Sequence, residues 1–367
     1  MQTNDTPYIA IYRRFRPEIF DKVIGQAHVV NVLKAQIASG SVPHAYLFSG
    51  TRGTGKTTMA RLLAKGLNCL SDAERPCGVC ENCRAIAEGG FVDVIEIDAA
   101  SNNGVADVRE IKDIVIYPPT SGKYRVFIID EAHMLTQAAS NAFLKTLEEP
   151  PENTVFILAT TEPGKLPATI RSRCLSFEFK RLPQALIKEG LAGIAERLGI
   201  EAEGIALSLI ATESDGSFRD ALSVLEQCLP PGRVNLTRED VLEAVGSAGD
   251  DAFAELSEAV EAGDTAAALL KLAALIASGK EVRRIMEDWI DYYRSALLIK
   301  YIEKPETLLA RAPENIDEIR KRTGNISESR LSASIVKLSK LYNESRWLSH
   351  PGILLEMLII ELSEEAR

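Results

Sequence analysis

The stretch Gly50-Thr51-Arg52-Gly53-Thr54-Gly55-Lys56-Thr57 decides the fold. It follows the apolar run at 45–48 and precedes a helical pattern at 59–64, which is the context that a G-x-x-x-x-G-K-T motif requires. In that context the backbone N–H groups and the helix N-terminus face a phosphate chain. Lys56 is expected to reach the outer phosphates, and the Thr57 hydroxyl is expected to be a Mg²⁺ ligand. The motif predicts a site for ATP or GTP, and the alternative is a glycine-rich turn that binds nothing.

The size and charge of the chain limit its class. With 367 residues it is expected to form two or three domains. No stretch approaches the roughly 18 apolar residues of a membrane span, and the polar first residues predict no signal peptide. We therefore expect a cytoplasmic protein with no membrane partner.

The net charge of −10 is unevenly placed. Residues 1–182 carry 21 basic and 20 acidic residues, whereas residues 183–367 carry 21 and 32. Such a balance argues against non-specific coating of DNA. Any contact with nucleic acid is expected to come from a local patch in the first half.

The first half alternates short strands with helices, and the second half is helical. The expected strands are 45–49, 93–97, 125–129, 154–160 and 174–179. This alternation predicts a parallel, doubly wound α/β sheet. Three or four helices are expected over 184–245, a linker at 246–249, and helices throughout 250–367. The expected domains are 1–182, 183–246 and 247–367.

Two local patterns in the helical half give further expectations. Thr237 begins a capping-box-like pattern that ends at Asp240. The apolar run 353–360 is expected to be buried in a bundle or against another subunit.

An acidic pair completes the expected nucleotide site. Asp130 and Glu131 follow the buried strand 125–129, about one βαβ unit after the phosphate loop. Asp130 is expected to hold Mg²⁺ through water, and Glu131 to polarise the attacking water. His133 is expected to cap or pack. The alternative is a solvated strand end.

Four further residues carry weaker signals. Thr160 and Thr161 end another buried strand and could sense a γ-phosphate, or be ordinary strand-end threonines. Arg173 precedes a strand and could stabilise transition-state charge across a subunit interface. Arg219 begins a helix and could reach nucleotide in its own chain. For both arginines the alternative is a solvated surface position.

Four of the six cysteines lie within fifteen residues, at Cys69, Cys77, Cys80 and Cys83. Their spacing suits four thiolate ligands around one tetrahedral Zn²⁺, which leaves no open position and predicts a structural role. An iron–sulfur cluster and free buried thiols are the alternatives.

Together these motifs resemble the gamma/tau family of bacterial DNA polymerase III subunits, the AAA+ ATPases of the replicative clamp loader. Residues 8–26 (YIAIYRRFRPEIFDKVIGQ) resemble the family's adenine-binding segment. The phosphate loop, the cysteine module at 69–83, Asp130 to His133, Ala159 to Thr161 and Ser172-Arg173-Cys174 follow in family order. The resemblance covers essentially the whole chain and is most specific over residues 8–183.

The resemblance implies an ATPase domain with a zinc module, a helical lid and a helical collar. It implies ATP with Mg²⁺, structural Zn²⁺, and a motor that opens a sliding clamp and loads it onto primer–template DNA. The implied partners are delta- and delta-prime-type subunits, copies of this chain in a pentameric ring, and a polymerase core reached through a tail. The collar is expected to end near Arg367, with no tau-like tail in the printed sequence.

The resemblance also assigns residues to roles. Thr161 matches sensor 1 with Thr160 beside it, Arg219 matches sensor 2, and Arg173 matches the finger that acts on a neighbour's ATP. The implied DNA contacts are Ser101 and Arg109, although residues 101–105 contain no Lys where some relatives have a base. The remaining nucleotide contacts are implied at Tyr8, Arg16, Pro17, Val23, Ile24, Gly50, Thr51, Arg52, Gly53, Thr54, Gly55, Lys56, Thr57 and Thr58.

Two other functions remain open. One is a non-catalytic nucleotide-binding scaffold, which would be expected to have lost Lys56 or Glu131. The other is a different AAA+ machine, such as a branch-migration helicase, against which the cysteine module and the lack of a basic, winged-helix-like C-terminal domain argue. The three differ in whether primed DNA and clamp stimulate ATP hydrolysis.

Overall fold

The computed structural model describes residues 9–104, 113–230, 232–245, 250–305, 308–309, 313–347 and 350–367. The chain divides into two compact units, one formed by residues 1–194 with 214–223 and the other by 195–213 with 224–367. The expected linker at 246–249 lies outside the described residues. The expected domain boundaries at residues 182 and 246 stay predictions.

The first unit is built on one five-stranded parallel sheet. Its strands are β1 (Ala45–Gly50), β2 (Val94–Asp98), β3 (Arg125–Asp130), β4 (Thr154–Thr160) and β5 (Leu175–Phe179). Their order is β2-β3-β4-β1-β5, and every neighbouring pair is parallel. The five predicted strands are confirmed, with ends that differ by at most one residue. Because all five run the same way, their carboxyl ends meet at one edge of the sheet.

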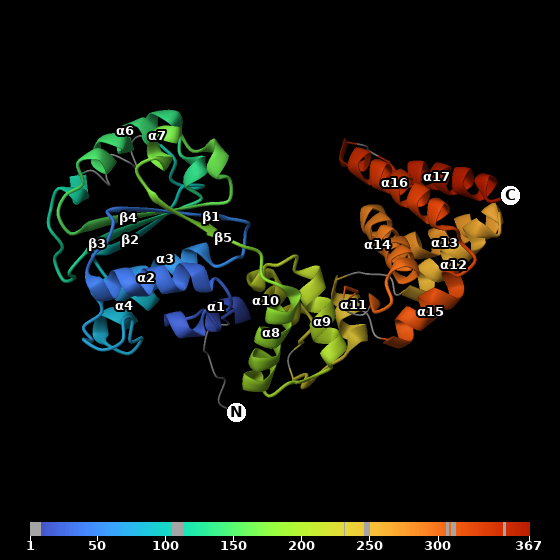
Figure 1. The fold of residues 1–367 in the computed structure, drawn as a ribbon, viewed down its shortest axis with the longest axis horizontal. Helices are drawn as coiled ribbons and strands as arrows, with labels where there is room; N and C mark the ends of the chain where they lie inside the picture. The colour runs from blue at the N-terminus through green and yellow to red at the C-terminus, as the bar shows by residue number, and fades with distance from the viewer. Residues whose placement is uncertain are drawn as a thin grey trace, which may run out of the picture. The chain divides into compact units, whose positions relative to one another are not determined.

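Helices cover both faces of this sheet (Figure 1). One face carries α2 (Ala27–Ser39), α3 (Lys56–Asn68) and α4 (Glu81–Glu88), and the other carries α6 (Gln137–Glu148) and α7 (Ala168–Arg171). The short elements of this unit are α1 (Ile11–Arg14), η1 (Phe20–Lys22), η2 (Ala132–Met134) and η3 (Pro163–Lys165). The predicted doubly wound architecture is confirmed.

The alternating direction of side chains along each strand explains why both faces of the sheet are covered by helices. Tyr46 and Phe48 of β1 are buried with residues of α2 and α3, whereas Ala45 and Leu47 are buried with Phe143 of α6. Successive side chains of a strand point to opposite faces. A strand covered on both faces is therefore apolar throughout, as these four consecutive buried residues are.

The second unit is almost entirely helical. Its elements and those that lead into it are α8 (Gln184–Leu198), β6 (Glu201–Ala202), α9 (Gly204–Glu213), α10 (Phe218–Gln227), β7 (Asn235–Leu236), α11 (Arg238–Val245), α12 (Asp250–Glu261), α13 (Thr265–Ala277), α14 (Val282–Tyr301), α15 (Pro313–Thr323), α16 (Glu328–Glu344), η5 (Ser345–Trp347) and α17 (Pro351–Glu365). The four helices between 184 and 245 agree with the prediction, but the parallel pair β6–β7 was missed. Two-residue strands are too short to show a periodicity.

The capping box at α11 is present. The Thr237 hydroxyl accepts a hydrogen bond from the Asp240 N–H (3.3 Å), and the Asp240 carboxylate accepts one from the Thr237 N–H (2.9 Å). These reciprocal bonds satisfy N–H groups that the helix itself leaves without partners. Thr237 therefore fixes the start of α11 at Arg238.

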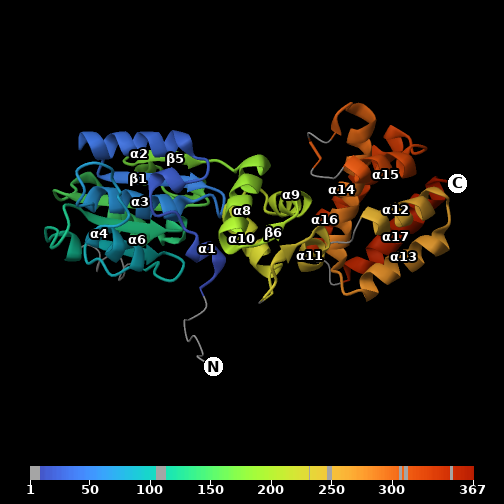
Figure 2. The ribbon, with the colours of Figure 1, turned by 90° about the horizontal axis from the view of Figure 1, so that it is seen from below.

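Helices α12 to α17 pack around one core that includes Trp289, Tyr292 and Tyr293 (Figure 2). The apolar run 353–360 is buried on one face only: Leu355 and Ile359 are fully buried, whereas Ile353 and Met357 are more than half exposed. The expected burial of the whole run therefore does not occur within one chain. Among the described residues no helix is long and apolar enough to cross a membrane.

A buried ion pair fixes the amino edge of the sheet. Asp93, which is fully buried, accepts hydrogen bonds from the N–H groups of Thr120, Ser121 and Gly122 and from the Arg125 guanidinium (2.8 Å). Burial alone would raise the pKa of Asp93, but these donors outweigh it and lower the pKa from 3.8 to about 2. The pair thus anchors the loop that leads into β3.

Asp93→Asn should lower the free energy of unfolding by about 3–5 kcal/mol, because it leaves the buried Arg125 without its counter-charge. Urea denaturation measures the loss, and Asp21→Asn is the control because Asp21 lies in an exposed ion pair with Lys34. The Asp93 contribution is fully present above about pH 4 and is lost as the pH falls toward 2, because the folded-state pKa is depressed. A loss no larger than that of the control would refute the anchoring role.

Candidate nucleotide site

The phosphate loop joins β1 to α3 at the carboxyl edge of the sheet. Gly50, Gly53 and Gly55 all have positive φ (147°, 76° and 100°), a region that residues with a Cβ rarely adopt. The buried Lys56 ammonium donates to the carbonyl oxygens of Gly50 (2.8 Å) and Thr51 (2.9 Å). Burial lowers the pKa of Lys56, while the charges of Glu131 and Asp130 act against that shift. The loop thus holds a cation beside two carboxylates.

The other expected loop residues differ in their burial. Thr54 is buried and donates to the Thr51 carbonyl (2.8 Å), and Thr58 is half-buried on the first turn of α3. Arg52 and Thr51 are exposed.

The two expected magnesium ligands meet across the sheet edge. The Thr57 hydroxyl on α3 donates to the Asp130 carboxylate at the end of β3 (2.7 Å). These residues are 73 positions apart in the sequence. Oxygen ligands of this kind are those that Mg²⁺ takes in proteins, so the pair could hold the ion.

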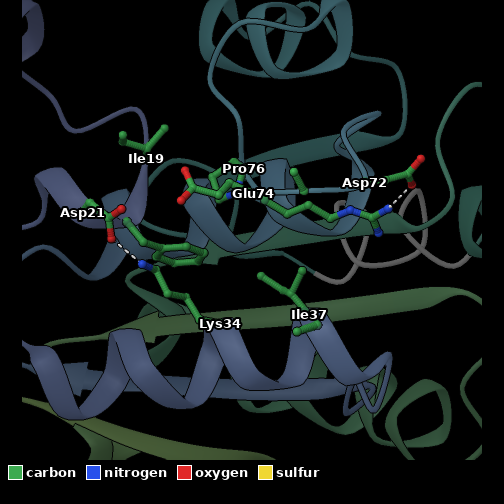
Figure 3. A pocket seen from close by; sticks show the side chains of 11 residues that line it. Ile19, Asp21, Lys34, Ile37, Asp72, Glu74 and Pro76 are labelled. Carbon is green, nitrogen blue, oxygen red and sulfur yellow. Dashed lines mark hydrogen bonds and ion pairs between the residues drawn. The ribbon is translucent and has the colours of Figure 1, made fainter.

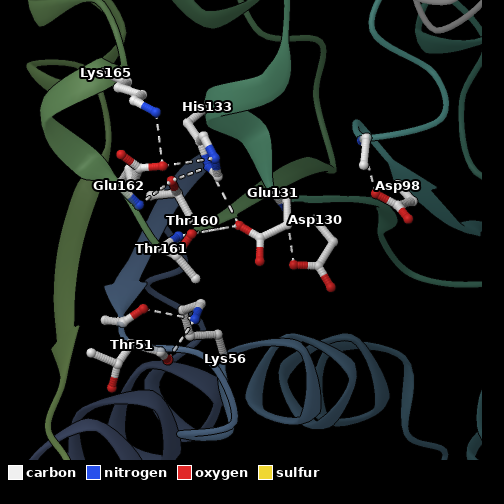
Figure 4. A network of polar contacts seen from close by, with 12 residues as sticks. Thr51, Lys56, Asp98, Asp130, Glu131, His133, Thr160, Thr161, Glu162 and Lys165 are labelled. Atoms are coloured by element: carbon white, nitrogen blue, oxygen red, sulfur yellow. Dashed lines mark hydrogen bonds and ion pairs between the residues drawn. The ribbon is translucent and has the colours of Figure 1, made fainter. Parts of the chain in front are cut away.

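Glu131 follows directly and has a strained backbone. Its φ of 46° and ψ of 45° lie in the left-handed region, which costs about 1–2 kcal/mol for a residue with a side chain. Its carboxylate accepts hydrogen bonds from the Thr161 hydroxyl (3.0 Å) and the Thr161 N–H (3.3 Å) (Figure 4). Strained residues persist where their surroundings fix them, which is common at functional sites.

The two threonines at the end of β4 have different surroundings. Thr160 is fully buried and pairs in register with Ser49 of β1, so it lies beside the strand that leads into the phosphate loop. Its hydroxyl accepts from the Glu162 N–H (3.1 Å) and lies 3.0 Å from a ring nitrogen of His133. Thr161 instead contacts Glu131. Sequence reasoning missed this use of His133, which was expected only to cap or pack.

The N-terminus of α10 packs against the phosphate loop. The Ser217 hydroxyl accepts from the Asp220 N–H (3.2 Å) and caps the helix. A Cβ placed on Gly53 would lie 1.8 Å from the Ser217 hydroxyl oxygen. Arg219 lies on the same first turn, with its guanidinium 4.7 Å from the centre of the Tyr12 ring. Arg219 is thus near the phosphate loop of its own chain, as expected.

The expected adenine-binding segment, residues 8–26, contacts Lys180 just after β5 and Gly190 of α8. The Gln26 side chain donates to the Lys180 carbonyl (2.6 Å) and accepts from the Lys180 N–H (3.2 Å). A Cβ on Gly190 of α8 would lie 2.5 Å from a methyl carbon of Ile24, so these two positions are in close contact.

Arg16 is half-buried, and its pKa is lowered by burial and by the charge of Arg61. Pro17 and Val23 are half-buried, and Tyr8 lies outside the described residues.

Arg173 lies at the opposite edge of the sheet from the phosphate loop. It precedes β5, whose first residue, Leu175, pairs with Tyr46 near the start of β1. From Tyr46 to Gly50 a strand rises roughly 13 Å. The Arg173 guanidinium donates to the Glu148 carboxylate (2.7 Å) and the Thr169 carbonyl (2.8 Å). It is therefore not placed to reach nucleotide in its own chain.

Of the two expected DNA contacts, Ser101 is exposed in the turn after β2, and its N–H donates to the Asp98 carbonyl (3.1 Å). Arg109 lies outside the described residues.

The four cysteines gather between α3 and α4. The sulfur atoms of Cys69, Cys77, Cys80 and Cys83 all lie within 4.8 Å of one another. Ligands 2.3 Å from a tetrahedral zinc ion are about 3.8 Å apart. Backbone N–H groups donate to the sulfurs of Cys69 (3.4 Å), Cys77 (3.3 Å) and Cys80 (3.4 Å), which favours thiolates. The cluster is compatible with zinc.

A cavity of about 390 Å³ lies beside this module, between the loop at 72–76 and α2 (Figure 3). Four of its charged side chains form two ion pairs, Lys34 with Asp21 and Arg75 with Asp72, and Glu74 also lines it. It is separate from the phosphate loop, and the cysteine loop packs here against Ile19.

Comparisons with known proteins agree with these features. Residues 25–183 match the family model of the "DNA polymerase III, delta subunit", residues 186–233 that of the "DNA polymerase III clamp loader subunit, ATPase lid domain", and residues 236–366 that of "DNA polymerase III subunits gamma and tau domain III". The DNA polymerase III subunit tau of Bacillus subtilis is 41% identical over 359 residues, which are 97% of this chain and 63% of that protein. Subunit tau of Escherichia coli is 49% identical over 270 residues, 73% of this chain and 42% of that protein.

The chain thus spans less than two thirds of the length of these relatives. Among solved structures, a variant of Thermotoga maritima RuvB is similar with a TM-score of 0.50 and 21% identity, over 73% of this chain and 86% of that one. This last likeness concerns the fold alone, which is that of an AAA+ ATPase followed by helical domains.

Gly53→Ala should lower the free energy of unfolding more than Gly40→Ala does. Both glycines have similar φ (76° and 72°), so the backbone strain is matched, but a Cβ on Gly40 would meet nothing within 4 Å. The excess is expected to be about 1–3 kcal/mol, as for overpacking, and urea denaturation without nucleotide measures it.

Adding Ser217→Gly should recover most of the excess because it removes the clashing atoms. Equal losses of unfolding free energy in Gly53→Ala and Gly40→Ala would show that α10 is not tightly packed against the phosphate loop.

Proposed function

This chain belongs to the gamma/tau family of DNA polymerase III subunits, and we propose that it is an ATP-hydrolysing motor subunit of a clamp loader. The observation that carries the proposal is the division of catalytic groups between two edges of one sheet. Lys56, Thr57, Asp130 and Glu131 gather at the carboxyl edge, and Arg173 lies at the other. With this arrangement, one chain can bind ATP, but its Arg173 cannot act as the arginine finger for that same ATP.

Each group at the carboxyl edge has a distinct task in this proposal. The loop N–H groups and Lys56 bind the phosphates of ATP. Thr57 and Asp130 hold the Mg²⁺ ion, which neutralises phosphate charge when bound. Glu131 accepts a hydrogen bond from the attacking water and orients it. Thr160 and Thr161 sense the γ-phosphate at the end of β4. Arg219 senses the nucleotide from the lid.

Arg173 completes the site of a neighbouring chain. A finger of this kind stabilises the charge that develops on the transferred phosphoryl group. Because the neighbour supplies it, hydrolysis depends on assembly of the ring, which keeps free subunits from consuming ATP. The exposed position of its ion pair with Glu148 supports this, since a half-exposed pair is weak enough to exchange partners.

The proposed partners follow from the family. They are delta- and delta-prime-type subunits and copies of this chain in a pentameric ring, the sliding clamp, and primer–template DNA in the cytoplasm. Residues 1–182 would be the ATPase domain, 183–246 the lid and 247–367 the collar. Ser101 and Arg109 would contact DNA phosphates, and a polymerase core would bind through a tail outside these residues.

The cysteine cluster is proposed to hold one structural Zn²⁺. Four thiolates leave the ion no open position for chemistry. The ion would stiffen the loop that packs against Ile19, which belongs to the proposed adenine segment.

A non-catalytic scaffold is the alternative function. It is disfavoured because Lys56 and Glu131 are both present and each makes polar contacts at the carboxyl edge of the sheet.

Arg173→Ala should bind ATP almost normally yet lose hydrolysis stimulated by clamp and primed DNA, by about 10³–10⁵-fold. Lys56→Ala should instead lose ATP binding, because the phosphates lose their cation. The measurement is ATP turnover in loaders reconstituted with each variant and with mixtures of the two. In a mixture, sites with an intact loop beside an intact finger should recover activity, whereas each variant alone should not.

Glu149→Ala is the control, because Glu149 is an exposed carboxylate next to Glu148. If no mixture recovers activity, Arg173 does not act on a neighbour's site.

Cys80→Ser should lower metal content and stability while the affinity for ATP changes little, because a structural site contributes folding free energy and no chemistry. Metal analysis of protein never exposed to a chelator should find about one Zn²⁺ per native chain. Cys228→Ser is the control, since Cys228 is buried outside the cluster. Finding no metal in the native chain would refute the zinc assignment.

A further inference from the structure

His133 lies at the centre of the polar network around Glu131. Its side chain is only 8% exposed. One ring nitrogen, Nδ1, is 3.3 Å from Glu131 Oε2 and 3.0 Å from the Thr160 hydroxyl. The other, Nε2, is 3.5 Å from a Glu162 carboxylate oxygen. Both ring nitrogens therefore face groups of the nucleotide site or of the loop that follows β4.

The contacts to Glu131 all converge on one carboxylate oxygen. Oε2 accepts from the Thr161 hydroxyl and N–H and faces His133 Nδ1. None of the described residues donates to Oε1. Figure 4 shows this second oxygen on the side of Lys56 and Thr51, which agrees with the electrostatic effect of Glu131 on Lys56. Oε2 is thus held by its contacts, whereas Oε1 faces the phosphate loop.

The backbone explains why Glu131 needs such a hold. Its left-handed conformation begins the short 3₁₀ turn η2, which carries His133 two residues later. A glutamate has three side-chain torsions, so its carboxylate would otherwise sample many positions. Contacts from a turn and from a strand end restrict it to one of them.

The far side of the imidazole is anchored as well. Glu162, which faces Nε2, also pairs with Lys165 (2.9 Å) on η3. The ring is therefore held between Glu131 and the loop after β4, and a shift of Thr160 or Glu162 would move it.

We infer that His133 is a positioning residue, which together with Thr161 holds Oε2 of Glu131 so that Oε1 faces the attacking water. This inference rests on the proposed ATP hydrolysis with Glu131 as the base. His133 does not touch the substrate. It fixes the direction of the carboxylate and ties that direction to the end of β4, where the γ-phosphate is sensed.

The test compares two replacements of His133. His133→Phe keeps a planar ring and removes both nitrogens, whereas His133→Asn keeps a polar atom close to the position of Nδ1. In the reconstituted loader with clamp and primed DNA, His133→Phe should lower kcat by about tenfold to a hundredfold, the effect of misplacing a catalytic group by about 1 Å. The ATP dissociation constant should change less than twofold. His133→Asn should recover most of kcat.

Two controls separate positioning from general damage. His28→Phe replaces an exposed histidine whose Nε2 lies 2.9 Å from the Glu178 carbonyl oxygen, and it should leave kcat unchanged. Thermal unfolding of every variant shows whether the fold is retained. If His133→Phe does not fold, His133→Met replaces it in the comparison of kcat with His133→Asn.

Several results would overturn the inference. They are a native kcat in His133→Phe, an equal loss in His133→Asn and His133→Phe, or a loss of ATP binding that matches the loss of kcat. Glu131→Gln separates the two proposals. If that variant hydrolyses ATP at the native rate, the role of Glu131 in the proposed function is wrong, and the inference falls with it.

Discussion

The arrangement of this site depends on one constraint, the parallel hydrogen bonding of all five strands of the sheet. Because β1, β3 and β4 are adjacent and run in one direction, their carboxyl ends share one edge. The phosphate loop, Asp130 and Thr160 each stand at the end of one of these strands. Residues far apart in the sequence thereby come within hydrogen-bond distance, as Thr57 and Asp130 do. At the other edge, the buried pair of Asp93 and Arg125 fixes how β2 and β3 begin.

The same constraint separates Arg173 from the nucleotide of its own chain. The residue precedes β5, so it stands at the edge where the strands begin. In the proposed function, the cation, the magnesium ligands and the base come from one edge, so a second chain would have to supply the finger. In the proposed loader this makes ATP hydrolysis a property of the ring. The polar network of Glu131, Thr161 and His133 adds a connection within the chain, from the proposed catalytic carboxylate to the end of β4, where the proposal places the sensing of the γ-phosphate.

Much of the fold and site could be predicted from the sequence because the signals are local. The glycines and Lys56 of the phosphate loop, the buried strand before Asp130 and the cysteine spacing each lie within a short window. What was missed depends on contacts between distant segments. Ser217 lies against Gly53 only because α10 folds back onto the loop. Asp93 finds its donors 27 to 32 positions further along the chain. His133 looked like a packing residue because its partners at Thr160 and Glu162 are 27 and 29 positions away. The apolar run of α17 was predicted to be buried in a bundle or against another subunit, and the bundle of one chain covers a single face of it.

The central claim is that one chain holds ATP but cannot hydrolyse it efficiently alone. It is tested most directly by measuring ATP binding and single-turnover hydrolysis for the isolated monomer, and then for the loader assembled with its partner subunits, clamp and primed DNA. The account predicts one ATP bound per monomer with very slow hydrolysis, and an increase of about 10³-fold or more on assembly. A monomer that hydrolyses bound ATP as fast as the assembled loader would contradict it.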